Sequence, residues 1–316
     1  MNKFLRQISF FLVVIIVIIF ISAYFYGNLK NNYLKNKNFK INIETTTLIL
    51  GDSHSQTTFD DKKIPHSKNI SFHAEHYIFT YFKLLKILSA NPQITNVVLS
   101  FGPHNISQGS DISLFSSQRT SRSFARYFML LDANGVKDIY SPSQNWRINY
   151  LKWKYNIPFQ LKLEAKLIIK VLQQKEIKLR DYPFIGSFHS SNKHVFKDVS
   201  TPIKIHYYSN GNELKKSEIA LKYFYKIIEL CDENNIKLIL VNTPQHKEYR
   251  NLIPQYFVSY YKKTVYKVSQ LYPNVIYIDY SDYQLSDSCF GDYHHVNNIG
   301  SEIITNELLK SPINYK

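Results

Sequence analysis

The residues with the clearest chemical potential are a serine in a Gly-Asp-Ser sequence and an Asp-x-x-His pair far along the chain. Ser53 stands in Gly51–Ser55. Asp292 and His295 are three positions apart in Phe290–Gly300. A serine hydroxyl becomes a good nucleophile beside a base, and the base needs an acceptor that fixes its tautomer. These three residues can fill those roles, although a serine there also suits a helix cap and the histidine a polar loop.

A further polar segment follows the apolar run Val97–Phe101. Gly102–Asn105 contains an imidazole and an amide, from His104 and Asn105, whose N–H groups could donate to an oxyanion. On its own this segment reads equally well as an ordinary polar loop. Its interest comes from its place, because it follows an apolar run just as Gly51–Ser55 does.

Short apolar runs alternate with stretches of helical periodicity along most of the chain. We predict strands at Thr47–Leu50, Asn69–Phe72, Val97–Phe101, Ile236–Val241 and Val275–Ile278. Helical spacing is found at Ile78–Leu88, Ile219–Leu230, Leu252–Leu271 and from Asn298 onward. This alternation predicts an α/β fold, a flavodoxin-like doubly wound parallel sheet of about five strands. Ligands bind at the carboxyl ends of such strands, where the three polar segments would meet.

Residues 106–210 interrupt the alternation and are interpreted as an insertion. Two helical stretches are expected within it, Phe124–Leu131 and Phe159–Gln174, and the rest is rich in Ser, Asn, Tyr and His. We therefore predict a largely helical insertion in the α/β domain.

The N-terminal segment is apolar enough to cross a membrane. From Ile8 to Tyr26 the apolar run is broken only by two serines, and about 20 apolar residues span the hydrocarbon core as a helix. We predict a membrane anchor over residues 1–27, a polar stalk over 28–44 and one α/β domain over 45–316. A small-residue sequence ending at Ala23 leaves open that the segment is cleaved as a signal peptide.

Composition narrows the classes of partner. The chain has 316 residues, 44% of them hydrophobic, and a net charge of +15. Its lysines are scattered, with no zinc-finger spacing or RNA-binding signature, so we expect a solvated basic surface and no nucleic-acid partner. The two cysteines, Cys231 and Cys289, lie in separate segments outside any CxxC, so we expect no metal site or cofactor.

The polar blocks resemble those of the SGNH/GDSL hydrolase family. That family places its serine in a GDS block after the first strand, and an Asp-x-x-His pair near the C-terminus, often followed by Asn and Gly. Leu50–Ser53 and Asp292–Gly300 match the two blocks in order and context. The resemblance covers residues 45–312, with 106–210 as the insertion.

The resemblance implies a role for each matched residue. Ser53 would be the nucleophile, Asp292 and His295 would complete the triad, and the Asp-x-x-His spacing selects His295 over the adjacent His294 as general base. Ser55 is the next candidate nucleophile.

Two departures from the family pattern concern the oxyanion hole. The family's G-x-N-D block has Asn where this chain has His104, so either Asn105 serves with a one-residue shift or His104 replaces it. The family's second block has a Gly whose N–H lines the hole. The nearest stretch here, Ser71–Ala74, has no Gly and leaves Ala74 as the candidate donor.

The resemblance also implies a function. Membrane-anchored members act on cell-envelope polysaccharide, and Val241–His246 is similar to the alginate- and teichoic-acid-modifying subgroup. We expect an esterase or O-acyltransferase on the extracytoplasmic side, with an acylated glycan as substrate and a membrane-bound O-acyltransferase as partner. The alternative is a non-catalytic scaffold of the same fold in an envelope polysaccharide assembly complex.

Overall fold

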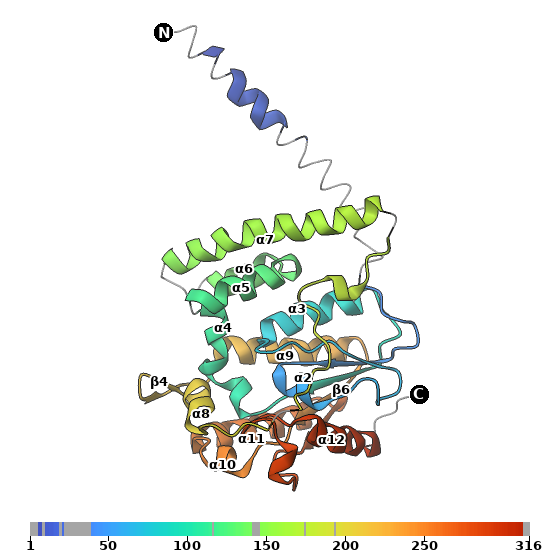
Figure 1. Ribbon diagram of the computed structural model, residues 1–316, viewed down its shortest axis with the longest axis vertical. Helices are drawn as coiled ribbons and strands as arrows, with labels where there is room; N and C mark the ends of the chain where they lie inside the picture. The colour runs from blue at the N-terminus through green and yellow to red at the C-terminus, as the bar shows by residue number, and fades with distance from the viewer. Residues whose placement is uncertain are drawn as a thin grey trace.

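The described part of the protein is built around one parallel sheet. A computed structural model describes residues 39–311, apart from 116, 141–145, 174 and 193, together with residues 6–7, 10–18 and 21. The strands of the sheet are β1 (Thr47–Leu50), β2 (Ser67–Asn69), β3 (Asn96–Ser100), β6 (Lys237–Asn242) and β7 (Val275–Asp279). They pair in parallel in the order β2-β1-β3-β6-β7 (Figure 1). This order is that of a doubly wound fold, and the predicted α/β class with a five-stranded parallel sheet is confirmed.

Alternate residues of the central strands point to opposite faces of the sheet, and helices cover each face. Leu48, Leu50 and Leu99 pack against α3 (Tyr77–Leu88), α9 (Glu218–Glu233) and α11 (Gln255–Leu271). Ile49 and Val98 face the other way, toward α12 (Asn298–Lys310). Strands buried on both faces read as continuous apolar runs, which is why β1 and β3 stand out in the sequence.

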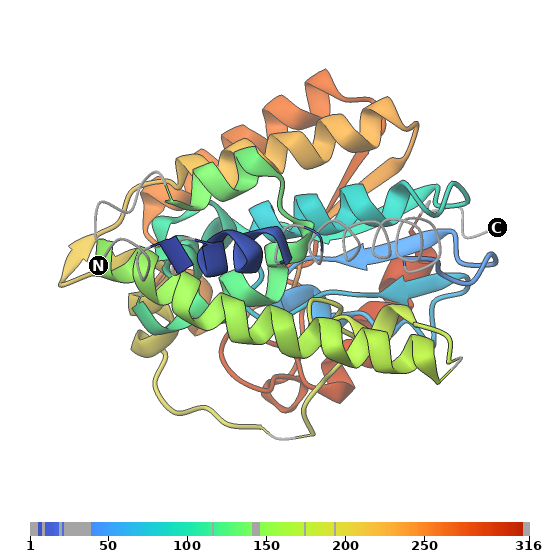
Figure 2. The same ribbon diagram turned by 90° about the horizontal axis from the view of Figure 1, so that it is seen from above.

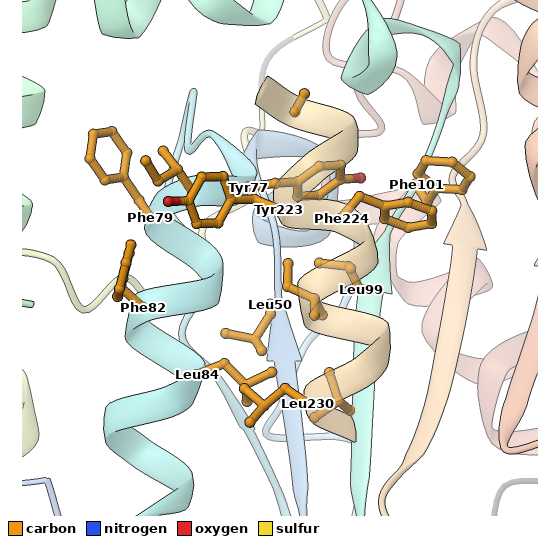
Figure 3. Close-up of a cluster of buried hydrophobic side chains, with 14 of the residues drawn as sticks. Leu50, Tyr77, Phe79, Phe82, Leu84, Leu99, Phe101, Tyr223, Phe224 and Leu230 are labelled. Carbon is orange, nitrogen blue, oxygen red and sulfur yellow. The ribbon is translucent and has the colours of Figure 1, made fainter. Parts of the chain in front are cut away.

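The larger of the two layers lies between α3 and α9. In Figure 3, Tyr223 and Phe224 of α9 lie among side chains that come from α3 and from the strands below. The ring of Phe224 stacks on Phe101, just past β3, with centroids 4.1 Å apart. Each large apolar side chain buried in this way contributes about 1.5–3 kcal/mol. This layer therefore packs one face of the paired strands β1 and β3 against α3 and α9.

Several element boundaries differ from the predicted ones. β2 ends at Asn69, where a strand over Asn69–Phe72 was expected, because the Asn69 side chain turns toward the carbonyls of Ser55 and Phe59. The helix expected over Leu252–Leu271 begins three residues later, as α11, because Pro254 is its N-cap residue. The short helix α10 (Lys247–Asn251) precedes it and was not predicted.

The insertion contains helices α4–α8, and a small hairpin spans its C-terminal boundary. The helices are α4 (Ile112–Phe115), α5 (Ser117–Tyr127), α6 (Ala133–Tyr140), α7 (Trp146–Leu172) and α8 (Ser200–Tyr207). α7 begins well before the predicted Phe159, because it continues through Pro158, whose position is exposed to solvent. Strands β4 (Tyr208–Ser209) and β5 (Asn212–Glu213) join through Asn210 and Gly211, both at positive φ, which is the usual turn for a two-residue hairpin.

Part of the predicted membrane anchor lies within the described residues. Residues 10–18 are helical and exposed. Among the residues that the structure describes, no helix is long and apolar enough to cross a membrane. The rest of the predicted anchor and most of the predicted stalk lie outside the described residues.

Cys231 and Cys289 are both buried and free.

The turn after β1 is a point where both the backbone conformation and the available space favour glycine. Gly51 has φ +119°, and a Cβ there would lie 2.2 Å from the Ser100 Oγ. Gly211 also has positive φ, at +80°, but a Cβ there would meet nothing within 4 Å. Comparing alanine substitutions at the two positions therefore distinguishes the cost of backbone strain, present at both, from the cost of steric overlap, present only at Gly51.

We predict that Gly51→Ala lowers the free energy of unfolding by at least about 3 kcal/mol, because strain and overlap act together. Gly211→Ala is the control and should lower it by about 1 kcal/mol, because only the backbone is strained. Urea denaturation followed by circular dichroism measures both. Equal losses in the two variants would show that the contact with Ser100 does not constrain the turn.

Candidate active site

The structure brings Ser53, His295 and Asp292 into one hydrogen-bonded row. The Nε2 atom of His295 lies 2.8 Å from the Ser53 Oγ. The Nδ1 atom of the same ring lies 2.9 Å from Asp292 Oδ2. When Nδ1–H donates to the carboxylate, Nε2 is left to accept the serine proton, which is the tautomer that a general base needs. The three residues singled out from the sequence therefore meet with the geometry of a catalytic triad.

Ser53 reaches this position as the first residue of α2 (Ser53–Thr58). β1 ends at Leu50, the Gly51 turn reverses the chain, and the carboxylate of Asp52 caps the helix by accepting the backbone N–H of His54 at 2.9 Å. The first N–H groups of a helix have no partner within the helix. The hydroxyl and the backbone N–H of Ser53 thus stand together at the carboxyl edge of the sheet.

The loop that carries Asp292 and His295 is held in shape by its own polar groups. Asp292 Oδ1 accepts the backbone N–H groups of His294 and His295, each at 2.9 Å. Asn297 caps α12 through the N–H of Ile299 at 2.9 Å. Such aspartate turns fix the backbone locally, so the His295 ring folds back over the carboxylate that bonds it. The short spacing between the two residues therefore has a direct geometric cause.

The surroundings of the Asp292 carboxyl favour its ionised form. Burial works to raise its pKa, but the hydrogen bond and charge of His295, together with the backbone N–H groups of the turn, outweigh burial and lower the pKa below its ordinary value. An ionised partner holds the His295 tautomer and stabilises the imidazolium that forms when the base takes a proton.

Asp52 is the hub of the neighbouring network. Its Oδ1 atom lies 3.2 Å from both the His54 Nδ1 and the Ser100 Oγ. Its Oδ2 atom lies 2.9 Å from His104 Nε2 and accepts the Asn105 amide at 2.8 Å. Burial alone would raise the pKa of this carboxyl, but the charges and hydrogen bonds of His54 and His104 outweigh burial and hold the pKa well below its usual range.

This network bears on the candidate oxyanion donors. When the Nε2–H of His104 donates to Asp52, the Nδ1 atom of a neutral ring has only a lone pair. A neutral His104 therefore has no N–H left to donate to an oxyanion. Asn105 also donates to Asp52, but its amide has a second N–H, and the residue lines the same cavity as Ser53. Asn105 therefore fits the role of donor better than His104 does.

Ala74 lies in the stretch where the SGNH/GDSL pattern that the sequence resembles would have a glycine, and its backbone takes a conformation that glycine favours. Its φ is +52°, in the left-handed region that favours glycine. Within the described residues its N–H has no hydrogen-bond partner, and it lines the cavity beside Ser53. The N–H groups of Ala74 and Ser53 and the Asn105 amide are thus the donors available around one small space.

That space is a cavity of about 150 Å³ between the sheet edge and the insertion. Gly109 and Ser110, from the 3₁₀ helix η2 (Gln108–Asp111), form one side of it, together with Ile205 and His206 from α8. A Cβ on Gly109 would lie 2.3 Å from the His206 carbonyl oxygen, so these two parts of the insertion pack closely. The insertion thus forms one wall of this cavity.

Five histidine rings gather around the serine. The ring of His54 stacks on His104 with centroids 4.0 Å apart and lies 4.7 Å from His295. His206 and His294 complete the group, with centroids 5.1 Å apart. Burial, reinforced by neighbouring histidines, lowers the pKa of His54 to about 4 and that of His206 and His294 well below the ordinary value. Three of the five rings are therefore uncharged at neutral pH.

Two overlapping groups among the described residues have ligand atoms close enough to hold a metal ion. One is His54 with His294 and His295, and the other is Asp52 with His54 and His104. In the first group, both ring nitrogens of His295 are engaged with Ser53 and Asp292. An ion in this first group would compete directly with the hydrogen bonds of His295, so this group fits proton transfer better than a resident metal.

Some of these residues were not found by sequence reasoning. The structural role of Asp52 was readable in principle, because an aspartate before a predicted helix is a typical N-cap. His206, whose Nδ1 lies 2.5 Å from the Tyr249 hydroxyl, has no local signal, since only the packing of the insertion brings it to the site. His246, part of the segment noted for its family likeness, bonds to Asp287 and supports the triad loop from outside.

Comparison with known proteins adds little about the site. A model of an uncharacterised protein family matches residues 209–314, a segment that includes Asp292 and His295 but not Ser53. No curated protein matches the chain.

Acid should destabilise the folded protein through the buried histidines. A histidine whose folded pKa is depressed takes up a proton on unfolding, so the free energy of unfolding falls as pH drops from about 6.5 toward the folded value of about 4. For His54 alone the loss amounts to about 3 kcal/mol. Urea denaturation of the protein across this pH window measures the effect.

A pair of variants tests whether His54 causes this loss. His54→Gln should reduce the pH dependence of the free energy of unfolding by the share of His54, because His206 and His294 still contribute. The same change at the exposed His189 should leave the dependence as in the wild type. If the dependence is unchanged in His54→Gln, His54 is not a buried neutral histidine.

Proposed function

We propose that the protein is a serine-dependent acyl-ester hydrolase or O-acyltransferase of the SGNH type that acts on a cell-envelope or extracellular polysaccharide. The observation that carries the proposal is the row of Ser53, His295 and Asp292, joined at 2.8 and 2.9 Å. A structural polar loop has no need of a serine aligned on an imidazole whose other ring nitrogen bonds a carboxylate. The same row at the carboxyl edge of a parallel sheet is where such folds bind ligands.

The reaction follows from which atoms hold protons. The Ser53 oxygen attacks the acyl carbonyl carbon while His295 Nε2 takes the hydroxyl proton, and Asp292 stabilises the resulting imidazolium. The carbonyl π electrons move to oxygen and form the oxyanion. When the tetrahedral intermediate collapses, the bond to the alcohol oxygen breaks and His295 returns the proton to that leaving group. The acyl–serine ester is then attacked by water in hydrolysis, or by a sugar hydroxyl in transfer.

The oxyanion needs donors fixed before the reaction. The candidates are the backbone N–H groups of Ser53 and Ala74 and the free N–H of the Asn105 amide. Asp52 orients two of these three, because it caps the helix that begins at Ser53 and accepts the other proton of the Asn105 amide. Each donor of this kind contributes a rate factor of about 10²–10³ in enzymes that use one.

The sizes of two neighbouring spaces favour a short acyl group and a larger acceptor. The 150 Å³ cavity beside Ser53 has room for an acetyl group rather than a long chain. On the other side of the triad loop lies a cavity of about 350 Å³, lined in part by Lys197, Asp292 and Tyr293. Its aromatic ring and mixed charges suit a sugar unit. An acylated glycan bridging the two spaces would place its ester at the serine.

The site and the N-terminal sequence together suggest a setting. The apolar N-terminal segment supports a single-pass membrane protein with this domain on the extracytoplasmic side, where envelope polysaccharide is reached. A membrane-bound O-acyltransferase is the partner that would supply acyl groups there. A non-catalytic scaffold of the same fold is the alternative. It is favoured by one observation, that two candidate oxyanion donors, His104 and Asn105, already bond to Asp52.

Single substitutions distinguish an enzyme from a scaffold. We expect Ser53→Ala and His295→Ala each to lower kcat on a simple acetyl ester by about 10³-fold or more, because each removes a member of the triad. His294→Ala should cost far less, since its ring touches the cluster but not the serine. Circular dichroism checks that the variants are folded.

Two outcomes would contradict this assignment. An inactive His294→Ala beside an active His295→Ala would mean that the neighbouring histidine is the base. If a folded Ser53→Ala variant hydrolyses the ester at the wild-type rate, Ser53 is not the nucleophile and Ser55 becomes the candidate.

A further inference from the structure

Helix α7 exposes an unusual share of large apolar side chains. Residues 39–311 contain seventeen exposed large hydrophobic residues among those the structure describes, and nine of them lie on α7. Large apolar residues on the surface of a soluble protein are usually scattered singly. A contiguous patch of them marks a site that contacts a membrane or another protein. The rest of the domain does not share this property, so the feature belongs to this one helix.

The exposed residues form a continuous stripe. Six of them recur at spacings of four and seven residues, which keeps them on one side of a helix: Trp146, Tyr150, Ile157, Leu161, Ile168 and Leu172. The opposite side is buried against the domain through Lys152, Asn156, Leu163 and Leu167. The fold therefore covers one face of α7 and leaves the apolar stripe exposed.

Basic side chains border the stripe. α7 contains six basic residues and one acidic residue. Among the basic ones, Arg147, Lys154, Lys162 and Lys166 are exposed. A helix with Trp, Tyr, Leu and Ile on one side and Lys or Arg beside them has the composition of helices that lie in the plane of a membrane interface. Lysine is depleted at protein–protein interfaces, so the composition favours lipid over a protein partner.

The position of α7 agrees with this composition. Figure 1 shows it as the outermost layer of the domain, on the side from which the helical residues 10–18 project. Viewed from above in Figure 2, residues 10–18 again lie over the α7 side of the molecule. Those residues are themselves apolar and exposed. Two apolar surfaces therefore gather at one end of the protein.

We propose that α7 is an interfacial helix that lies on a bilayer surface carrying acidic phospholipid headgroups. The stripe from Trp146 to Leu172 enters the boundary between headgroups and acyl chains, and Arg147, Lys154, Lys162 and Lys166 contact the headgroup phosphates. The insertion thereby sets the orientation of the domain on the membrane. This role is independent of the reaction at Ser53 and requires no catalytic activity.

The chain supplies its own probe, because its two tryptophans, Trp146 and Trp153, are both exposed on α7. The ring of Trp153 also leans on Phe128, with centroids 5.9 Å apart, so Trp146 is the cleaner reporter. Trp153→Phe in the full-length protein leaves Trp146 as the single tryptophan. The protein is reconstituted into phosphatidylcholine vesicles with or without phosphatidylglycerol, and with acyl chains brominated or not.

In vesicles with phosphatidylglycerol we expect Trp146 emission to shift to the blue, to be largely lost with brominated chains, and to resist quenching by aqueous iodide. Lys154→Glu, Lys162→Glu and Lys166→Glu together should reverse these effects. The same charge change at Lys262, Lys263 and Lys267 of α11, away from α7 in both views, is the control and should leave them in place.

Three results would overturn the proposal. Trp146 quenched by iodide and untouched by brominated chains would leave α7 in water. A blue shift that needs no lipid and grows with protein concentration would make a second copy of the chain the occupant of the stripe. Equal quenching in vesicles with and without phosphatidylglycerol would contradict the assignment of acidic headgroups.

Discussion

A buried carboxylate at the end of the first strand is the constraint on which the rest of the site depends. Asp52 is 7% exposed and must be compensated, because an unpaired charge in that position would cost several kcal/mol. Its compensation comes from the N-terminus of α2, from Ser100 at the end of β3, and from His104 and Asn105 in the following turn. Satisfying one charge therefore fixes the relative positions of three chain segments, and Ser53 is the residue next to it.

The remaining parts of the site are arranged around this fixed edge. The aspartate turn at Asp292 places His295 beside Ser53, and the insertion places His206 against His104 and His294. Because burial keeps the rings of His54, His206 and His294 uncharged, the site can hold five histidines without accumulating positive charge. His295 differs from the other four histidines in its hydrogen-bond partners, because its ring lies between Asp292 and Ser53.

Some elements and site residues could be predicted from the sequence and others could not, for physical reasons. The buried strands were predictable because β1 and β3 are apolar on both faces, and the triad was predictable because each member lies in a short motif after a strand. The left-handed Ala74, the pairing of His104 with Asp52 and the approach of His206 depend on contacts between residues far apart in the chain, which leave no local pattern. α7 was predicted too short, because its exposed apolar stripe, the polar residues on its buried face and Pro158 hide the usual pattern of a half-buried helix.

Covalent labelling with a serine-reactive fluorophosphonate tests the central claim most directly, because the reagent needs an activated serine and not a particular substrate. The account predicts one adduct per chain, located at Ser53 by peptide mass spectrometry, and its loss in His295→Ala, where the base is gone. A protein that hydrolyses acetyl esters but carries the adduct at Ser55, or carries none, would contradict the assignment of Ser53, His295 and Asp292 as the catalytic triad.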